Sequence, residues 1–94
     1  MARDFLASIY GKRITITGEF VSCGNLAWQK TMLLRNIKND NGKVITDHLW
    51  ILLKDFQSGM KFRRNKMVKV TGNVIHYARD DGVDFSIEPE IIEI

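Results

Sequence analysis

The chain has 94 residues and a formal net charge of +3; 45% of its residues are hydrophobic and 27% are charged. This size and composition are typical of one globular domain and exclude a second hydrophobic core. No apolar run approaches the roughly 20 residues of a membrane span, and the stretch MARDFLASIYGKR, interrupted by Ser8, is too weakly apolar for a signal peptide. A single cysteine, Cys23, allows no internal disulfide. We therefore expect a cytoplasmic protein without a membrane partner.

Charge is unevenly distributed along the chain. All fourteen lysines and arginines precede residue 80, together with only five acids, so residues 1–79 carry a net charge of +9. Residues 80–94 hold six acids and no base, a net charge of −6. A basic body favours a polyanionic partner. The alternative is that the acidic C-terminal segment neutralises basic neighbours within the fold.

A short helical start and five strands are predicted in chain order. Residues 4–10 space apolar groups for one or two helical turns after Asp4, ending at Gly11. Alternating apolar residues predict strands at about 12–22, 29–38, 43–53, 67–78 and from 83 onward. Residues 54–66 are not strand-like, and we expect this connector to place Phe56, Met60 and Phe62 in the core.

Two hairpin turns follow from short motifs. NDNG at 39–42 predicts a type I′ turn at Asn41-Gly42, and RDDG at 79–82 predicts a turn centred on Asp81-Gly82. Five short strands must close or pair their edges, and a strand that turns a barrel corner is relieved by a glycine or a bulge. Because Gly18 and Gly72 stand at matching places in two strands, we predict that both lie at bends or bulges of a five-stranded barrel.

The segment NKMVKVTGNV, residues 65–74, resembles the fourth-strand pattern of OB-fold domains that bind single-stranded DNA or tRNA anticodons. In that pattern a polar turn leads into an apolar-x-apolar-x-Gly-x-apolar strand; Arg64-Asn65-Lys66 stands here where the family often has Gly-Asp. The resemblance covers residues 12–94. It implies one all-β domain over 1–94, a five-stranded OB-fold Greek-key barrel after a short helical segment at 1–11. Its second and third strands, with the 1–2 and 4–5 loops, would form the binding face.

The second hairpin divides into two faces. A turn at Asn41-Gly42 pairs Arg35 with His48, Leu33 with Trp50 and Ile37 with Thr46. One face then carries Thr31, Leu33, Arg35, Ile37, Thr46, His48 and Trp50; the other carries Met32, Leu34, Ile45, Leu49 and Ile51, with Asn36 and Asp47, and is the better core. Arginine, histidine and tryptophan together suit bases that stack on an aromatic ring while phosphates meet cations. The alternative is an inverted assignment that makes Trp50 a core residue.

The remaining candidates lie in loops and at the last hairpin. Trp28 in the expected 1–2 loop is either a stacking platform or a lid over one barrel end. We expect Tyr77 opposite Ser86 and Arg79 opposite Asp84, with Arg79 either reaching a bound strand or pairing with Asp84. The opposite face of that hairpin would carry Val74, His76, Phe85 and Ile87, with His76 half-buried.

Basic residues are densest in the connector, where they either contact phosphates or are simply solvated. With these the predicted nucleic-acid interface consists of Trp28, Lys30, Arg35, His48, Trp50, Arg63, Arg64, Lys66, Tyr77 and Arg79.

Catalysis is not expected from this sequence. The two histidines are far apart, Cys23 has no CxxC partner, and Asp47-His48 lacks a nucleophile and an anion stabiliser. We predict no metal and no cofactor. The first hypothesis is a domain that binds single-stranded nucleic acid, DNA before RNA, with weak sequence preference, in a process such as DNA replication. The alternative is a protein–protein module, an accessory subunit that docks Leu33, Ile37 and Trp50 on a larger replication or repair enzyme.

Overall fold

The structure is a computed structural model that describes residues 10–26, 29–57, 59–79 and 82–94. Within them the chain forms five strands and one 3₁₀ turn: β1 (Arg13–Leu26), β2 (Gln29–Asn39), β3 (Val44–Leu52), η1 (Asp55–Gln57), β4 (Met67–Arg79) and β5 (Gly82–Glu93). The five predicted strands are confirmed. The helical turns predicted for residues 4–10 lie outside the described residues except at Tyr10, which begins a simple turn. No helix in the described part is long and apolar enough to cross a membrane.

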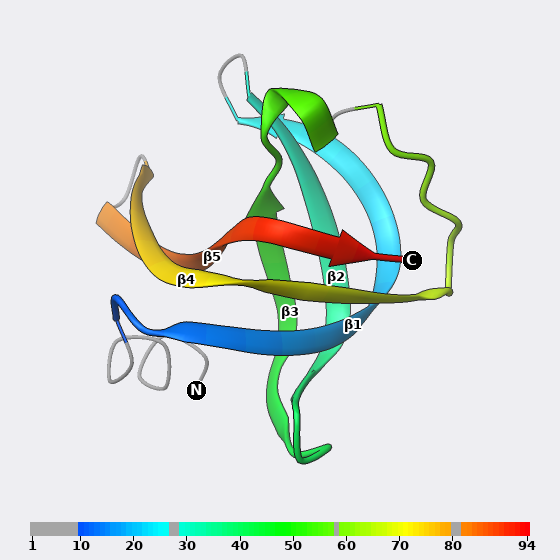
Figure 1. The fold of residues 1–94 in the computed structure, drawn as a ribbon. Helices are drawn as coiled ribbons and strands as arrows, with labels where there is room; N and C mark the ends of the chain where they lie inside the picture. The colour runs from blue at the N-terminus through cyan, green and yellow to red at the C-terminus, as the bar shows by residue number, and fades with distance from the viewer. Residues whose placement is uncertain (1–9, 27–28, 58, 80–81) are drawn as a thin grey trace.

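The strands form one antiparallel sheet in the order β3-β2-β1-β4-β5 (Figure 1). β1 is central, because residues 13–19 pair with β4 while residues 16–26 pair with β2. The sheet coils until the Cα atoms of its two edge strands, β3 and β5, approach within 8 Å.

No hydrogen-bonded ladder joins β3 and β5 among the described residues, so the sheet is not closed into the barrel predicted from the sequence. A side chain links the two edges instead. The Ser86 hydroxyl of β5 donates to the carbonyl oxygen of Trp50 in β3 over 2.6 Å. The Trp50 carbonyl thus accepts from a side chain of β5 and not from a backbone amide of a β3–β5 ladder.

Both predicted bend glycines lie at irregularities of the ladder. The β1–β2 register shifts between Thr17 and Glu19, which flank Gly18, and the β4–β5 register shifts between Thr71 and Gly72. A Cβ on Gly18 would lie 2.8 Å from Ile37 Cδ1, and one on Gly72 would lie 1.7 Å from the Glu88 carbonyl oxygen. At Gly72 the β5 backbone therefore lies closer than any side chain permits, whereas at Gly18 the nearest atom belongs to the Ile37 side chain.

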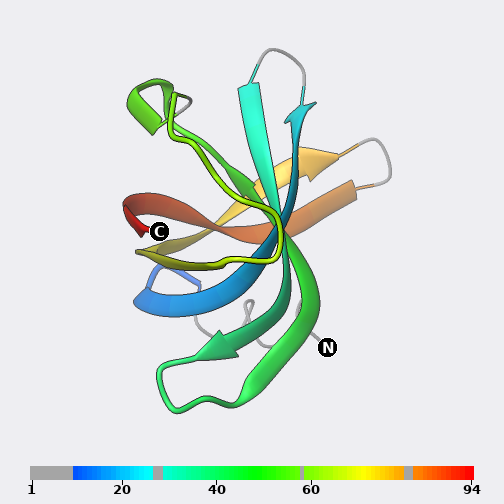
Figure 2. The same ribbon diagram turned by 90° about the vertical axis from the view of Figure 1, so that its right-hand side faces the viewer.

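The core lies inside the sheet, whose coiling is visible in Figure 2. Its buried hydrophobic residues come from every strand and from the chain just after β3: Ile16, Phe20, Met32, Leu34, Ile37, Leu49, Ile51, Leu53, Val68, Val70, Val74 and Ile87. The predicted core face of the second hairpin is confirmed, with Ile45 only partly buried at its end. Ile37 was wrongly assigned to the outer face. Asn36 has a φ of 52°, and this left-handed residue turns Ile37 inward into the space above Gly18.

Both hairpins differ from their predicted turns. Gly42, with a φ of 81°, is the only residue of the β2–β3 turn with a positive φ, which excludes type I′. The turn is a loop of residues 40–42 in which the Gly42 amide donates to the Asn39 carbonyl. In the last hairpin, Tyr77 pairs with Asp84 and Arg79 with Gly82, a shift of two residues from the prediction. Gly82 belongs to the ladder instead of the turn, whose tip at 80–81 lies outside the described residues.

The connector over residues 54–66 is irregular apart from η1, as predicted. Phe62 stacks on Phe20, with ring centroids 5.1 Å apart, and packs against the core. Met60 is partly buried. Phe56 was wrongly predicted to be a core residue, because it is 74% exposed. Gln57 turns inward from η1 in its place and is 2% exposed.

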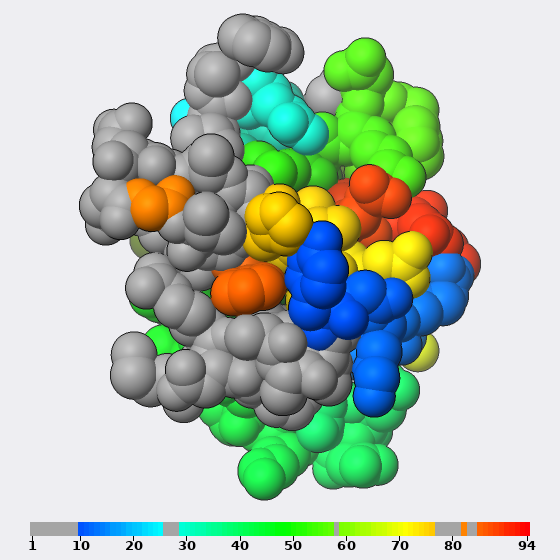
Figure 3. All heavy atoms as spheres, turned by 90° about the vertical axis from the view of Figure 1, so that its left-hand side faces the viewer, coloured from blue at the N-terminus to red at the C-terminus, as the bar shows by residue number. Residues whose placement is uncertain are grey.

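The start of the described chain packs beside β4 and β5, as the face in Figure 3 shows. Tyr10 lies 5.1 Å from the His76 ring and 6.2 Å from the Phe85 ring, measured between centroids. The Gly11 amide donates to the Val74 carbonyl. His76 pairs with Phe85 and Val74 with Ile87, which confirms the predicted shared face. His76 is exposed and not half-buried, because Tyr10 covers only part of its ring.

Candidate functional site

The outer face of β2 and β3 is the surface that points away from the core. Arg35 lies opposite His48, and Leu33 opposite Trp50, as the sequence predicted. Arg35 and His48 are exposed, whereas Leu33 and Trp50 are partly buried. Backbone alternation explains this arrangement, because the neighbours of Trp50 along β3 are the buried core residues Leu49 and Ile51.

Trp50 is held on the outer face and does not belong to the core. A Cβ placed on Gly24 would lie 3.4 Å from Cζ3 and 3.6 Å from Cη2 of its indole. The ring therefore reaches across β2 and lies against the bare backbone of β1. Its contact with Gly24 fixes the ring while leaving part of it exposed. A supported and partly exposed indole can stack on another flat ring.

Arg35, also on the outer face, is tied into a polar cluster. Its guanidinium donates to Glu19 Oε1 at 3.2 and 3.3 Å and to Asn65 Oδ1 at 2.9 Å. Asn36 Nδ2 donates to Glu19 Oε2 at 2.8 Å. These hydrogen bonds from Asn36 and Arg35 lower the pKa of Glu19 below its ordinary value. Glu19 thus neutralises much of the positive charge of Arg35. Through Asn65, the cluster also joins β1 and β2 to the connector.

The end of the connector forms a turn over residues 63–66, called here the basic turn. The Lys66 amide donates to the Arg63 carbonyl at 3.1 Å, and Asn65 has a φ of 67°, as the third position of a type II turn requires. The Asn65 amide donates to the Phe20 carbonyl, and the Phe20 amide donates to the Lys66 carbonyl, each at 2.9 Å. These bonds fix the turn against β1 beside Arg35.

The cations of the basic turn have no acidic partner. Arg63, Arg64 and Lys66 are exposed, and none has a carboxylate within 4.0 Å in the part of the chain that the structure describes. A row of unpaired cations on a fixed turn suits the phosphates of a nucleic acid backbone.

Other cations are neutralised by the acidic last strand. Glu90 pairs with Arg13, Glu88 with Lys54 at 3.7 Å, and Glu93 with Lys69 at 3.9 Å. The alternative interpretation of the charge asymmetry is therefore confirmed for these three pairs. It does not extend to the basic turn, which keeps its excess positive charge.

The other predicted site residues are placed as follows. Lys30 is exposed at the start of β2, five residues before Arg35, the β2 partner of His48. Trp28 lies outside the described residues. Tyr77 and Arg79 belong to β4, but their side chains lie outside the description. Sequence analysis did not single out Glu19 or Asn65, whose polar type alone gave no sign that they would meet Arg35.

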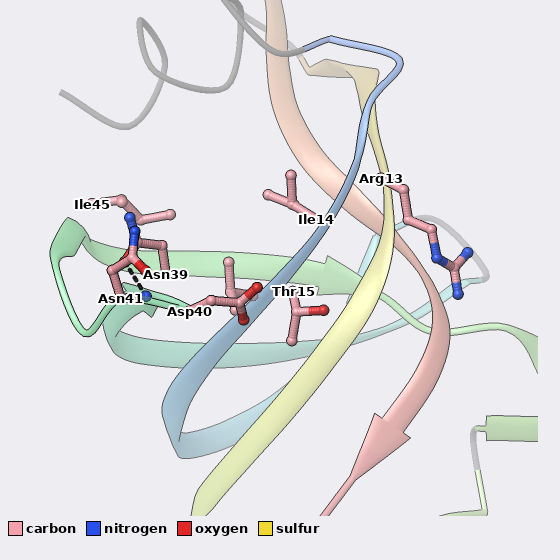
Figure 4. A pocket seen from close by; sticks show the side chains of 8 residues that line it. Arg13, Ile14, Thr15, Asn39, Asp40, Asn41 and Ile45 are labelled. Atoms are coloured by element: carbon pink, nitrogen blue, oxygen red, sulfur yellow. Dashed lines mark hydrogen bonds between the residues drawn. The ribbon is translucent and has the colours of Figure 1, made fainter.

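A shallow hollow of about 230 Å³ lies at the β2–β3 hairpin. In Figure 4, Asn39 and Asn41 stand on one side of it, where the Asn41 amide donates to Asn39 Oδ1, and Arg13 stands on the far side. None of the predicted interface residues lines this hollow. In the described ranges no group of three or more histidine, cysteine or acidic side chains is placed to hold a metal ion.

No protein-family model, curated protein or solved structure matches this chain. A function must therefore be inferred from the chemistry of the outer face and the basic turn.

Proposed function

We propose that the chain is an OB-type domain that binds single-stranded nucleic acid with weak sequence preference. Trp50 and the basic turn provide the binding surface, with bases stacking on the indole and phosphates meeting Arg63, Arg64 and Lys66. The observations that carry the proposal are the Trp50 ring, which lies on Gly24 at the outer face, and the exposed cations of the basic turn, which have no acidic partner among the described residues. Stacking is sequence-tolerant because every base has a π face.

The topology supports the OB assignment. An OB fold is a five-stranded, partly open Greek-key barrel whose second and third strands bind oligonucleotides. Here five strands coil until β3 and β5 approach without a ladder, and β1 pairs with both β2 and β4. The outer face of β2 and β3 is thus the surface that this class of fold uses.

DNA is the preferred polymer in this proposal. The residue opposite Trp50 is Leu33, which offers no hydrogen-bond partner. A ribose 2′-hydroxyl is the group that lets a protein distinguish RNA from DNA. A stacking site flanked by an apolar side chain gains nothing from that hydroxyl.

Protein docking is the weaker alternative. The predicted docking patch consisted of Leu33, Ile37 and Trp50, and Ile37 is fully buried. Leu33 and Trp50 are themselves only partly exposed. The remaining apolar surface is small for a stable interface with a replication or repair enzyme.

A fluorescence titration tests the proposed function. Oligo-dT and oligo-rU should quench the tryptophan fluorescence of the wild type, dT at lower concentration, and binding should weaken steeply between about 50 and about 200 mM salt. Replacing Arg63, Arg64 and Lys66 together by alanine should flatten the salt slope by about 2, because each phosphate contact to a single strand contributes about 0.7.

The matched control replaces Lys12, Lys38 and Lys43 by alanine. This changes the net charge equally but removes exposed cations that do not belong to the basic turn. If both triple variants lost equal affinity and equal salt slope, net charge alone would explain the effect. That result would contradict the assignment of phosphate contacts to the basic turn. A wild type that binds neither polymer at low salt would reject the function.

A further inference from the structure

Phe56 is the most exposed large hydrophobic residue among those that the structure describes, with 74% of its surface accessible. Isolated exposed apolar side chains are common, but a large aromatic ring with so much of its surface exposed is informative. The ring does not belong to the site described so far, because it lies in η1, beyond the end of β3.

The turn that presents Phe56 is firmly anchored. Its neighbour Gln57 is 2% exposed and accepts from the Lys54 amide at 2.9 Å through Oε1, while Nε2 donates to the Pro89 carbonyl at 2.6 Å. The backbone amide of Gln57 also donates to the Lys54 carbonyl. A buried glutamine thus fastens η1 to β5, and the aromatic side chain beside it is held outward on a rigid support.

The position of η1 continues the proposed interface. The Leu53 amide donates to the Lys30 carbonyl at 2.8 Å, and Gln29 Nε2 donates to the Leu53 carbonyl at 3.3 Å, so the chain leaving β3 is bound to the start of β2. In Figures 1 and 2, η1 stands at the same end of the molecule as the β1–β2 hairpin. Six residues separate Trp50 from Phe56, a reach of at most about 20 Å.

Cations as well as one acid stand around η1. Lys30, whose carbonyl binds the Leu53 amide, is exposed, and Lys54 keeps part of its surface accessible beside Glu88. Lys30 and the acid of the turn, Asp55, each have a further interaction within the chain. An exposed aromatic ring among cations is the combination that stacks bases while phosphates are neutralised.

We propose that Phe56 is a second base-stacking platform, so that a bound single strand runs from the basic turn over Trp50 to η1. This inference rests on the proposed function and deepens it. It assigns the site two aromatic anchors, of which Trp50 is reached by short oligonucleotides and Phe56 only by longer ones.

The test is a length series of oligo-dT, from about 4 to about 16 nucleotides, the range of site sizes for one OB fold. Phe56→Ala should bind the shortest oligonucleotides like wild type and the longest about 5- to 150-fold more weakly, since a stacked base contributes roughly 1–3 kcal/mol. Its thermal melt should match wild type because the ring is exposed. Phe56→Trp should restore binding and add fluorescence quenching that only long oligonucleotides produce.

Two controls separate stacking from other roles. Phe56→Leu keeps an apolar side chain without an aromatic face and should behave like Phe56→Ala. Val44→Ala removes an exposed apolar side chain at the opposite, β2–β3 hairpin end and should bind every length like wild type.

Each contrary outcome is distinct. A wild type that binds oligo-dT while Phe56→Ala matches it at every length overturns the inference and leaves the proposed function standing. If Phe56→Leu binds long oligo-dT as tightly as wild type, an apolar contact without stacking explains the affinity, and the inference is again overturned. A wild type that self-associates while Phe56→Ala is monomeric with unchanged DNA affinity assigns the ring to a contact between copies. A wild type that binds no oligonucleotide removes both proposals together.

Discussion

Glu19 pairs with Arg35 and so reduces the positive charge that the outer face of β2 and β3 offers. Its carboxylate accepts hydrogen bonds from Arg35 and Asn36 on β2, and Arg35 in turn donates to Asn65 of the basic turn. One acid therefore holds an arginine that a bound phosphate would otherwise contact. The same hydrogen bonds lower the pKa of Glu19, which links this contact to protein stability.

Replacing Glu19 by glutamine should remove a pH-dependent part of the stability. A carboxylate with a lowered folded-state pKa stabilises the protein fully above its ordinary pKa, and this contribution is lost as pH falls through the lowered value. Thermal melts of wild type and Glu19→Gln should therefore differ most at neutral pH and converge in acid. The two Tm curves running parallel over the whole range would show that the carboxylate contributes nothing by titration.

Trp50 is the residue on which the proposed interface most depends. Trp50→Ala should weaken oligo-dT binding by about 5- to 150-fold, the equivalent of one stacked base. Because the ring is only partly buried, the variant should lose less than the roughly 3–5 kcal/mol of a core tryptophan. Trp50→Phe, which keeps an aromatic face, should retain most of the affinity. If Trp50→Ala binds like wild type, another surface carries the function.

At the residue level, alternation along the strands predicted which way most side chains of the second hairpin point. Trp50, Arg35 and His48 follow it. Ile37 does not follow it, because Asn36 adopts a left-handed conformation that the local sequence pattern does not predict. Phe56 was misplaced because hydrophobicity alone suggested burial, whereas Gln57 has hydrogen-bond partners inside that an aromatic ring could not use.

At the scale of the elements, β1 and β4 depend on glycine for their close approaches. Gly72 faces the β5 backbone, where a Cβ would lie 1.7 Å from the Glu88 carbonyl oxygen. Backbone cannot move aside as a flexible side chain does, so β4 and β5 would have to separate to admit even a methyl group. Gly18 differs, because the nearest atom to its Cβ position is the movable Cδ1 of Ile37.

Gly72→Ala should therefore destabilise the protein by at least about 1–3 kcal/mol, the range for inserting a methyl group into a packed site. Chemical denaturation measures this difference. Gly59→Ala is the matched control, since a Cβ there meets nothing within 4 Å and Gly59 has no positive φ. A Gly72→Ala variant as stable as Gly59→Ala would mean that β5 yields at this point.

The register of the second hairpin followed from the sequence as far as Ile37, beyond which the β2–β3 ladder shifts. Most strand boundaries followed as well, but β1 extends to Leu26, four residues beyond its predicted end. The last hairpin was predicted two residues out of register. Its motif RDDG contains one glycine, and turn preference places that glycine at the centre of the turn. In the structure Gly82, with a φ of 138°, pairs with Arg79 as the first residue of β5.

At the scale of the whole molecule, charge and topology separate two surfaces. The acids of β5 pair with Arg13, Lys54 and Lys69, while the cations of the basic turn have no acidic partner in the described part of the chain. The net charge of +3 thus understates the positive potential that a nucleic acid would meet at the basic turn. Sequence composition revealed the asymmetry, but only the fold shows which cations the acids reach.

The seam between β3 and β5 is the weakest join in the sheet, because no ladder crosses it among the described residues. Ser86 is fully buried there and donates to the Trp50 carbonyl at 2.6 Å. Ser86→Ala leaves that buried carbonyl without this partner, which should cost about 1–3 kcal/mol of unfolding free energy. Ser22→Ala, at an exposed serine of β1, should cost almost nothing.

The same substitution tests whether the seam supports the interface. The carbonyl that accepts from Ser86 belongs to Trp50. Loss of this hydrogen bond should therefore make the backbone that carries the Trp50 ring more mobile. We expect Ser86→Ala to speed amide exchange in β3 and β5 more than in β1, which is hydrogen-bonded on both sides. Oligo-dT binding should weaken with it. Unchanged exchange in β3 together with a wild-type melt would show that core packing alone holds the two edges together.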